Sequence, residues 1–190
     1  MAEPQLHETQ LARWPIRFGP DYRETVSLRG GQRAQLTMLG REHAGRIVRG
    51  YAHLSRESRY MRFMSLRDEL TGPQLLHLTD TDGVRHLALG AGVQIGGACH
   101  EAGVGRFVQL ADRPDTVEAA VTVVDAFQRI GLGGLLIQRL FDAARERGYR
   151  DMSAEILSDN RAMLGLLAKI GRPIRLERDG TVTVARIRLQ

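Results

Sequence analysis

A glycine-rich segment, Gln128 to Gly134, has the composition of a binding site for a phosphate group. It follows an apolar run with strand character, Ala119 to Val124, and precedes an amphipathic helical pattern that begins at Leu135. The backbone N–H groups at the start of a helix have no intrahelical acceptor, and the helix dipole adds partial positive charge there. Such a turn favours anion binding, although the same residues also suit a tight turn that binds nothing.

Two common phosphate-binding motifs do not fit this segment. The dinucleotide fingerprint requires a glycine at position 136 when Gly131 and Gly133 supply its first two glycines, and Leu136 stands there. The P-loop requires Gly-Lys-Ser/Thr after its glycines, whereas Leu135 and Leu136 follow here. The pattern that does fit is Q/R-x-x-G-x-G/A, with Gln128, Gly131 and Gly133 at its fixed positions.

Hydrophobic periodicity predicts the elements that must position this turn. Strands are expected at residues 32–38, 85–90, 105–110, 116–124, 151–157, 174–177 and 182–189. Helices are expected at residues 42–54, 57–64, from 71 onward, 135–147 and from about 159 to 170. This order indicates an α/β or α+β domain built around a mixed sheet of about six to seven strands.

Length and composition are those of a single domain of 190 residues, 43% of which are hydrophobic. We expect residues 1–25 to form an N-terminal extension and residues 26–190 to form the domain. No apolar stretch is long enough to span a membrane, and the N-terminus lacks a signal core, so a cytoplasmic protein is expected. Cys99 is the only cysteine and the six histidines lack ligand spacing, so no metal site is expected.

The net charge is +5, and of the 27 basic residues only Lys169 is a lysine. The arginines are scattered along the chain rather than clustered, so nucleic acid is not the expected partner. Arginine holds phosphates and carboxylates with a rigid fork of donors. The basic balance is therefore better explained by a solvated surface together with a polyphosphate ligand.

These residues together resemble the GNAT family of acetyl-CoA-dependent N-acetyltransferases. The resemblance covers about residues 25–189 and is densest at 118–171, where the strand, the glycine turn, a helix and the block Asn160 to Met163 follow one another. Residues 54–63 resemble the branch that includes stand-alone proteins and the domains of protein-lysine acetyltransferases. The resemblance implies a mixed, mostly antiparallel sheet flanked by helices, with acetyl-CoA as the cofactor.

The family also implies which residues hold that cofactor. The backbone of residues 121–123 would pair with the pantetheine arm, an N–H near Val123 would face the thioester carbonyl, and the amides of residues 129–134 would hold the pyrophosphate. Asn160 would lie near the cofactor, although its type and place equally suit a helix cap. The cofactor-binding residues predicted in this way are Val121, Thr122, Val123, Gln128, Arg129, Ile130, Gly131, Leu132, Gly133, Gly134 and Asn160.

The acceptor amine must lose a proton before it attacks, because a lysine amine has a pKa of about 10.4. A base is therefore useful, and the resemblance places Glu118 where similar protein acetyltransferases carry theirs. A surface charge at the strand edge and a contact with substrate are the other interpretations of Glu118. The position of the tyrosine that protonates the leaving thiolate in many members is held by Leu167. This favours a tyrosine-free branch, a slow enzyme, or a domain that binds acetyl-CoA without transfer.

The sequence thus predicts direct transfer of an acetyl group, without an acyl-enzyme, to an amine on a protein lysine or a small molecule. The alternative is a non-catalytic regulatory domain that binds acyl-CoA. Neither nucleic acid nor a membrane is an expected partner, and a homodimer is possible. The family analogy says little about the acceptor, because its side of the site is built from variable N-terminal helices and the last hairpin.

Overall fold

The computed structural model describes residues 16–64 and 66–189 of the chain. These residues form one eight-stranded sheet with the order β1-β2-β3-β4-β5-β6-β8-β7, in which all neighbours are antiparallel except β5 and β6. The strands are β1 (Arg23–Ser27), β2 (Arg33–Met38), β3 (His86–Ile95), β4 (Ala98–Gln109), β5 (Thr116–Val123), β6 (Asp151–Leu157), β7 (Ile174–Asp179) and β8 (Val182–Arg188). The predicted mixed, mostly antiparallel fold is confirmed, with one strand more than the upper expected count.

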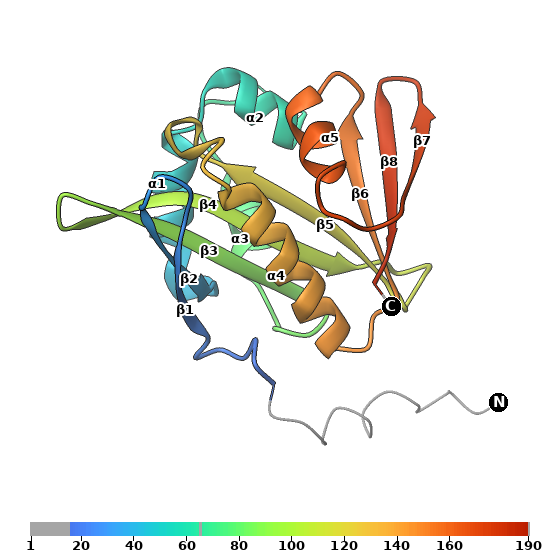
Figure 1. Ribbon diagram of the computed structural model, residues 1–190, viewed down its shortest axis with the longest axis horizontal. Helices are drawn as coiled ribbons and strands as arrows, with labels where there is room; N and C mark the ends of the chain where they lie inside the picture. Colours follow the sequence, from blue (N-terminus) through green and yellow to red (C-terminus); the bar gives the residue numbers. More distant parts are fainter. Residues whose placement is uncertain (1–15, 65, 190) are drawn as a thin grey trace.

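Helices cover both faces of the sheet (Figure 1). The five α-helices are α1 (Ala44–Ala52), α2 (Arg56–Phe63), α3 (Gly72–Thr79), α4 (Leu132–Glu146) and α5 (Arg161–Leu167), and two short 3-10 helices are η1 (Arg41–His43) and η2 (Asp125–Phe127). The α4 helix lies along one face over β4 and β5, whereas α1 and α3 pack together and α1 packs on β4. The residues of β4 therefore alternate between the α4 side and the side of the N-terminal helices.

Glycines in β4 let α4 approach the sheet closely. A Cβ atom on Gly105 would lie 3.2 Å from Leu140 Cδ1, and one on Gly103 would lie 2.9 Å from the carbonyl oxygen of Thr122 and 3.3 Å from Leu136 Cδ1. Leu136 and Leu140 are one turn apart on α4 and are fully buried, which is worth about 1.5–3 kcal/mol each. This packing fixes the helix along the sheet and sets its N-terminus beside the end of β5.

The strands β5 and β6 pair for only three residues and then diverge. Their parallel register joins Thr116 to Asp151, Val117 to Met152 and Glu118 to Ser153. Beyond that point β5 continues to pair with β4 on its other side as far as Val123, while β6 runs away from it (Figure 1). The edge of β5 that faces β6 therefore has no strand partner after Glu118. Apart from the Val123 oxygen, which accepts a hydrogen bond from the Gln128 side chain, its outward backbone polar groups are available to a ligand.

Several boundaries differ from the predicted ones for local reasons. The strand β1 was not predicted, because its sequence RETVS is short, polar and partly exposed, and the expected domain boundary at residue 25 falls inside it. The strand β4 begins at Ala98 rather than at residue 105. Glycine is unfavourable within strands, so the glycines of this segment hid its first half, although Gly103 and Gly105 here make room for α4. The hairpin turn before it uses Gly96 and Gly97, with φ of 56° and 83°.

Candidate active site

The glycine turn forms the junction between η2 and α4. Gly131 is the N-cap of α4 with φ of 94°, and Arg129 also has a positive φ, 65°, which is uncommon for a residue with a side chain. The first intrahelical bond runs from the Leu135 amide to the Gly131 oxygen, at 3.1 Å. The amides of the first three helical residues, 132–134, thus have no acceptor within the helix, as an anion site requires.

The start of α4 lies against both β5 and α5. A Cβ atom on Gly133 would be 3.0 Å from Leu166 Cδ2 and 3.8 Å from Val123 Cγ2. The glycine turn and the unpaired edge of β5 therefore meet at one place. Among the predicted cofactor residues, 121–123 and 128–134 are brought together in this way.

The side chains of Gln128 and Asn160, two of the predicted cofactor residues, form hydrogen bonds within the protein. The side-chain nitrogen of Gln128, Nε2, donates to the Val123 carbonyl oxygen at 3.2 Å and to Ser58 Oγ at 3.4 Å, so it ties the turn to the strand end and to α2. Asn160 Oδ1 accepts a hydrogen bond from the Met163 amide at 3.0 Å and caps α5. The structure thus gives Asn160 the capping role, and its contact with a cofactor stays a prediction.

A carboxylate network attaches α2 to the loop before the glycine turn. Asp125 accepts hydrogen bonds from the Ser55 amide at 2.9 Å and from the hydroxyls of Ser55 and Ser58, each at 2.8 Å. Burial alone would raise the pKa of Asp125, but these donors outweigh it and hold the pKa below its ordinary value. The network joins the N-terminal helices to the turn, and its partners lie about 70 residues apart, beyond the reach of any sequence motif.

We expect Asp125→Ala to lower the free energy of unfolding by roughly 1 kcal/mol and Tm by about 2–4 °C, because three donors lose their shared acceptor. The depressed pKa means that this contribution is present at neutral pH and disappears only as pH falls below the ordinary range of aspartate. Thermal melts of both proteins at pH 7 and at a series of decreasing pH values through and below the ordinary range of aspartate check both points. Asp112→Ala, in an exposed loop and paired with Arg113, is the control and should leave Tm unchanged.

Arg29 is a basic residue beside the glycine turn that the sequence did not indicate. Its amide donates to the Ile130 oxygen at 3.2 Å, and its Cγ lies 3.9 Å from where a Cβ on Gly131 would be. It comes from the β1–β2 hairpin, about a hundred residues earlier in the chain, so only the tertiary fold brings it here. A guanidinium at this place adds positive charge to an anion-binding turn.

We expect Arg29→Ala to weaken acetyl-CoA binding about two- to fivefold at low salt, as for an exposed charge contact. The loss should shrink as salt is raised, because the contact is electrostatic. Calorimetry at two ionic strengths measures it. Arg33→Ala removes the same charge from the same hairpin at an exposed position and should bind acetyl-CoA like the unchanged protein. Equal losses in the two variants would mean that only net charge matters.

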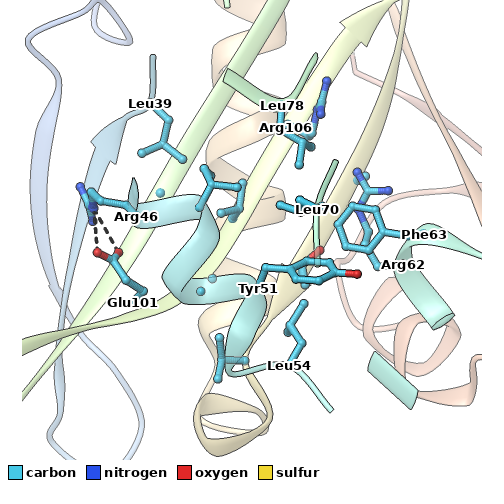
Figure 2. Close-up of a pocket in the computed structure, with 18 residues that line it drawn as sticks. Leu39, Arg46, Tyr51, Leu54, Arg62, Phe63, Leu70, Leu78, Glu101 and Arg106 are labelled. Carbon is cyan, nitrogen blue, oxygen red and sulfur yellow. Dashed lines mark hydrogen bonds and ion pairs between the residues drawn. The ribbon is translucent and has the colours of Figure 1, made fainter. Parts of the chain in front are cut away.

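A cavity of about 60 Å³ lies on the other face of the sheet, between the N-terminal helices and strands β3 to β5. Figure 2 shows its apolar walls and the charged groups at its ends, including the ion pair of Arg46 Nε with Glu101 at 3.0 Å. Its lining includes Tyr51, Leu54, Phe63, Leu70, Arg62 and Arg106. The residues Ala120 and Thr122 of β5 also line it, so this cavity reaches the strand that carries Glu118.

Glu118 projects on the cavity side of β5, because side chains two residues apart share a face. Burial and the nearby Glu155 raise the pKa of the Glu118 carboxyl, while Arg62 and Arg106 act in the opposite direction. A carboxylate with a raised pKa binds a proton more readily, which suits a general base. The structure thus places the predicted base beside a cavity and near two arginines.

Arg106 is fixed at this site by two histidines. Arg106 is only 5% exposed. Its Nη2 lies 2.7 Å from His86 Nε2, and it lies 3.3 Å from both Nε2 and the carbonyl oxygen of His77. Burial and the charge of Arg106 lower the pKa of His86 to about 4, so His86 is a neutral acceptor at pH 7. Burial lowers the pKa of Arg106 to about 10, and it stays charged.

The sequence carries one signal for this cluster. Arg106 lies in the middle of an otherwise apolar predicted strand, and a charge is rarely buried there without a partner. His86, taken alone, has the ordinary interpretation of a structural residue in a core strand. Leu167 is 4% exposed and packs in the core, so the family's tyrosine position offers no acid.

Comparison with known proteins then decides the family. Residues 53–171 match the model of the acetyltransferase (GNAT) family, which is more than half of the chain. The chain belongs to the GNAT family. This confirms the resemblance seen in the sequence and the expectation of an N-acetyltransferase.

Individual relatives agree with this assignment. Acetyltransferase PA5475 of Pseudomonas aeruginosa is 31% identical over 145 residues, which cover 76% of this chain and 77% of that protein. The GNAT domain of S. lividans PAT superposes with a TM-score of 0.80 at 27% identity, over 92% of this chain and 99% of that one. The acetyltransferase Pat of Mycolicibacterium smegmatis is 31% identical over 130 residues, and this GNAT chain spans 37% of its length.

A more distant neighbour, yncA from Salmonella typhimurium, was solved with its cofactor acetyl-CoA and shares the fold, with a TM-score of 0.61 at 22% identity.

In residues 16–64 and 66–189, no three His, Cys, Asp or Glu side chains gather as metal ligands would. None of the helices in this part of the GNAT chain is long and apolar enough to cross a membrane.

Proposed function

We propose that this GNAT protein is an acetyl-CoA-dependent N-acetyltransferase that uses Glu118 as its general base. One observation carries the proposal: β5 leaves β6 immediately after Glu118, and the unpaired strand edge ends at the glycine turn. An extended ligand with a diphosphate at one end and amide groups along its arm fits these two features. The free amides of α4 suit the diphosphate, and the backbone of Val121 to Val123 suits the amides.

Acetyl-CoA supplies the acyl group: the amine nitrogen bonds to its thioester carbonyl carbon while the C–S bond breaks and CoA leaves as a thiolate. Glu118 takes the proton released by the amine, directly or through a water in the cavity. A backbone N–H near Val123 stabilises the negative charge that develops on the carbonyl oxygen, which is worth about 2.7–4 kcal/mol of barrier. Because thiols have a pKa near 8.5, the thiolate leaves without a tyrosine, and Leu167 is compatible with turnover.

The acceptor is an amine of a protein lysine or a small molecule, delivered on the cavity side of β5. The N-terminal helices and the cavity are on that side, while the glycine turn begins the helix on the other face. The two substrates therefore approach the strand from different sides and meet at its edge. This arrangement supports direct transfer and needs no acyl-enzyme.

Calorimetry with acetyl-CoA, followed by a screen of amine acceptors for CoA release, tests the proposal. We expect binding and turnover of at least one class of amine. The second candidate is a regulatory domain that binds acyl-CoA. It is favoured by Leu167, which stands where many family members carry the tyrosine that acts as the acid. Binding without acetylation of any amine in the screen or in a lysate would establish that candidate, and no binding of CoA would overturn both.

A further inference from the structure

Two arginines enter the cavity, Arg62 from α2 and Arg106 from β4 (Figure 2). Among the described residues, neither forms an ion pair with a carboxylate. The hydrogen bonds of the Arg106 side chain to described residues all start from Nη2, so Nε and Nη1 have no acceptor there. The Arg62 guanidinium lies 4.9 Å from the centre of the Phe63 ring, and no hydrogen bond joins it to a described residue.

The two cations are close enough to act on each other. Burial lowers the pKa of both arginines, and Arg62 lowers the pKa of Arg106 further. The Glu118 carboxylate acts in the opposite direction on both, but one carboxylate balances only one of the two positive charges. His77 and His86 hold Arg106 in place but bring no negative charge. Like charges held near each other against apolar walls are costly, and a bound anion would offset that cost.

We propose that Arg62 and Arg106 form a carboxylate-binding subsite, so that the acceptor is a small amine that carries its own carboxylate on an apolar body, as an amino acid with an aliphatic side chain does. This inference rests on the proposed function and specifies its acceptor. The guanidinium forks suit a carboxylate, and the apolar walls formed by Tyr51, Leu54 and Leu70 suit the aliphatic body.

The register of β4 and β5 supports this assignment. Arg106 is directly opposite Ala120, which is two residues from Glu118 on the same face of β5. Two residues of strand span about 6.7 Å, so a carboxylate at the arginines leaves the amine of a small molecule within reach of Glu118. The amine then bonds to the acetyl carbon, the C–S bond breaks, and the amine proton passes to Glu118 as in the proposed reaction.

Binding is tested first, independently of turnover. With CoA present, calorimetry compares N-acetyl-L-leucine with N-acetyl-L-leucinamide, which differ only in the carboxylate. We expect the acid to bind at least tenfold more tightly, Arg62→Gln to abolish that preference, and Arg62→Lys to retain part of it. Arg56→Gln, exposed on the same helix, is the matched control and should keep the full preference. Equal affinities, or no binding of either compound, would overturn the subsite.

Transfer is tested next with L-leucine and L-leucinamide as acceptors. Loss of Arg62 also raises the pKa of Glu118, so the kinetics are measured at a pH above the acid limb of the profile. There Arg62→Gln should raise KM for leucine at least tenfold and leave KM for leucinamide unchanged, with kcat for both little altered. A variant that loses both acceptors equally would overturn the assignment. Preference for succinyl-CoA over acetyl-CoA that depends on Arg62 would also overturn it, because the carboxylate would then belong to the acyl group. Preserved binding of N-acetyl-L-leucine, with no acetylation of leucine or of any amine in the screen or a lysate, would refute the proposed function and leave the subsite standing.

Discussion

Replacing Glu118 with glutamine should lower kcat/KM by about 10²–10⁴-fold while acetyl-CoA binds as before. Glutamine has the same shape as glutamate and cannot accept the amine proton, so only the chemical step is affected. Steady-state CoA release and calorimetry with acetyl-CoA separate the two quantities. Unchanged turnover in Glu118→Gln would remove Glu118 as the base.

The pH dependence gives a second readout of the same residue. The base works when deprotonated, so activity falls as pH drops through the pKa of Glu118, and the raised pKa places this fall above the ordinary range of glutamate. Because Glu155 contributes to that rise, Glu155→Gln should move the acid limb of the kcat/KM profile to lower pH and retain turnover. In Glu118→Gln the residual activity should lack this limb.

Replacing Gly131 with valine should weaken acetyl-CoA binding by more than tenfold. The φ of 94° at this N-cap is strained for any side chain and most for a β-branched one, at a cost of roughly 1–3 kcal/mol. The turn relaxes by rotating this peptide, which removes the alignment of the first amides of α4. Calorimetry measures the affinity, and a thermal melt measures the accompanying loss of stability.

Gly148 provides a control at the other end of the same helix. It follows α4 with φ of 82°, and a Cβ there would meet nothing within 4 Å. Gly148→Val should therefore reduce stability in a similar way and leave acetyl-CoA affinity unchanged. If both variants lose binding to the same extent, general destabilisation is the cause and the turn has no special role.

The local sequence was sufficient to predict the elements that form the proposed cofactor-binding side of the site. The strand at 151–157 has the predicted bounds, and the glycine turn begins a helix as its spacing indicated, although α4 starts three residues earlier, at Leu132. These features depend on periodicity and capping, which are short-range. The strand β1 was not predicted because its residues gain stability from pairing with β2 rather than from their own pattern.

The acceptor side depends on contacts between distant residues and was beyond a single sequence. Arg106, His77 and His86 meet only because β3 and β4 pair and α3 packs nearby. Arg62 joins them from a fourth element. Taken alone, Arg62 suits a solvated helix face and His86 suits a structural place in a core strand. The tertiary fold brings both to Arg106 and makes them one cluster.

The edge of β5 that parts from β6 bears on how such a site tolerates mutation. Its hydrogen-bonding groups are main-chain amides and carbonyls, which every residue except proline presents in the same way. Exchanges among small apolar residues at Val121 or Val123 should therefore be nearly neutral for the ligand, whereas a proline would remove a donor from the row. The sequence of β5, TVEAAVTV, contains no proline, so every residue along this edge keeps its main-chain donor.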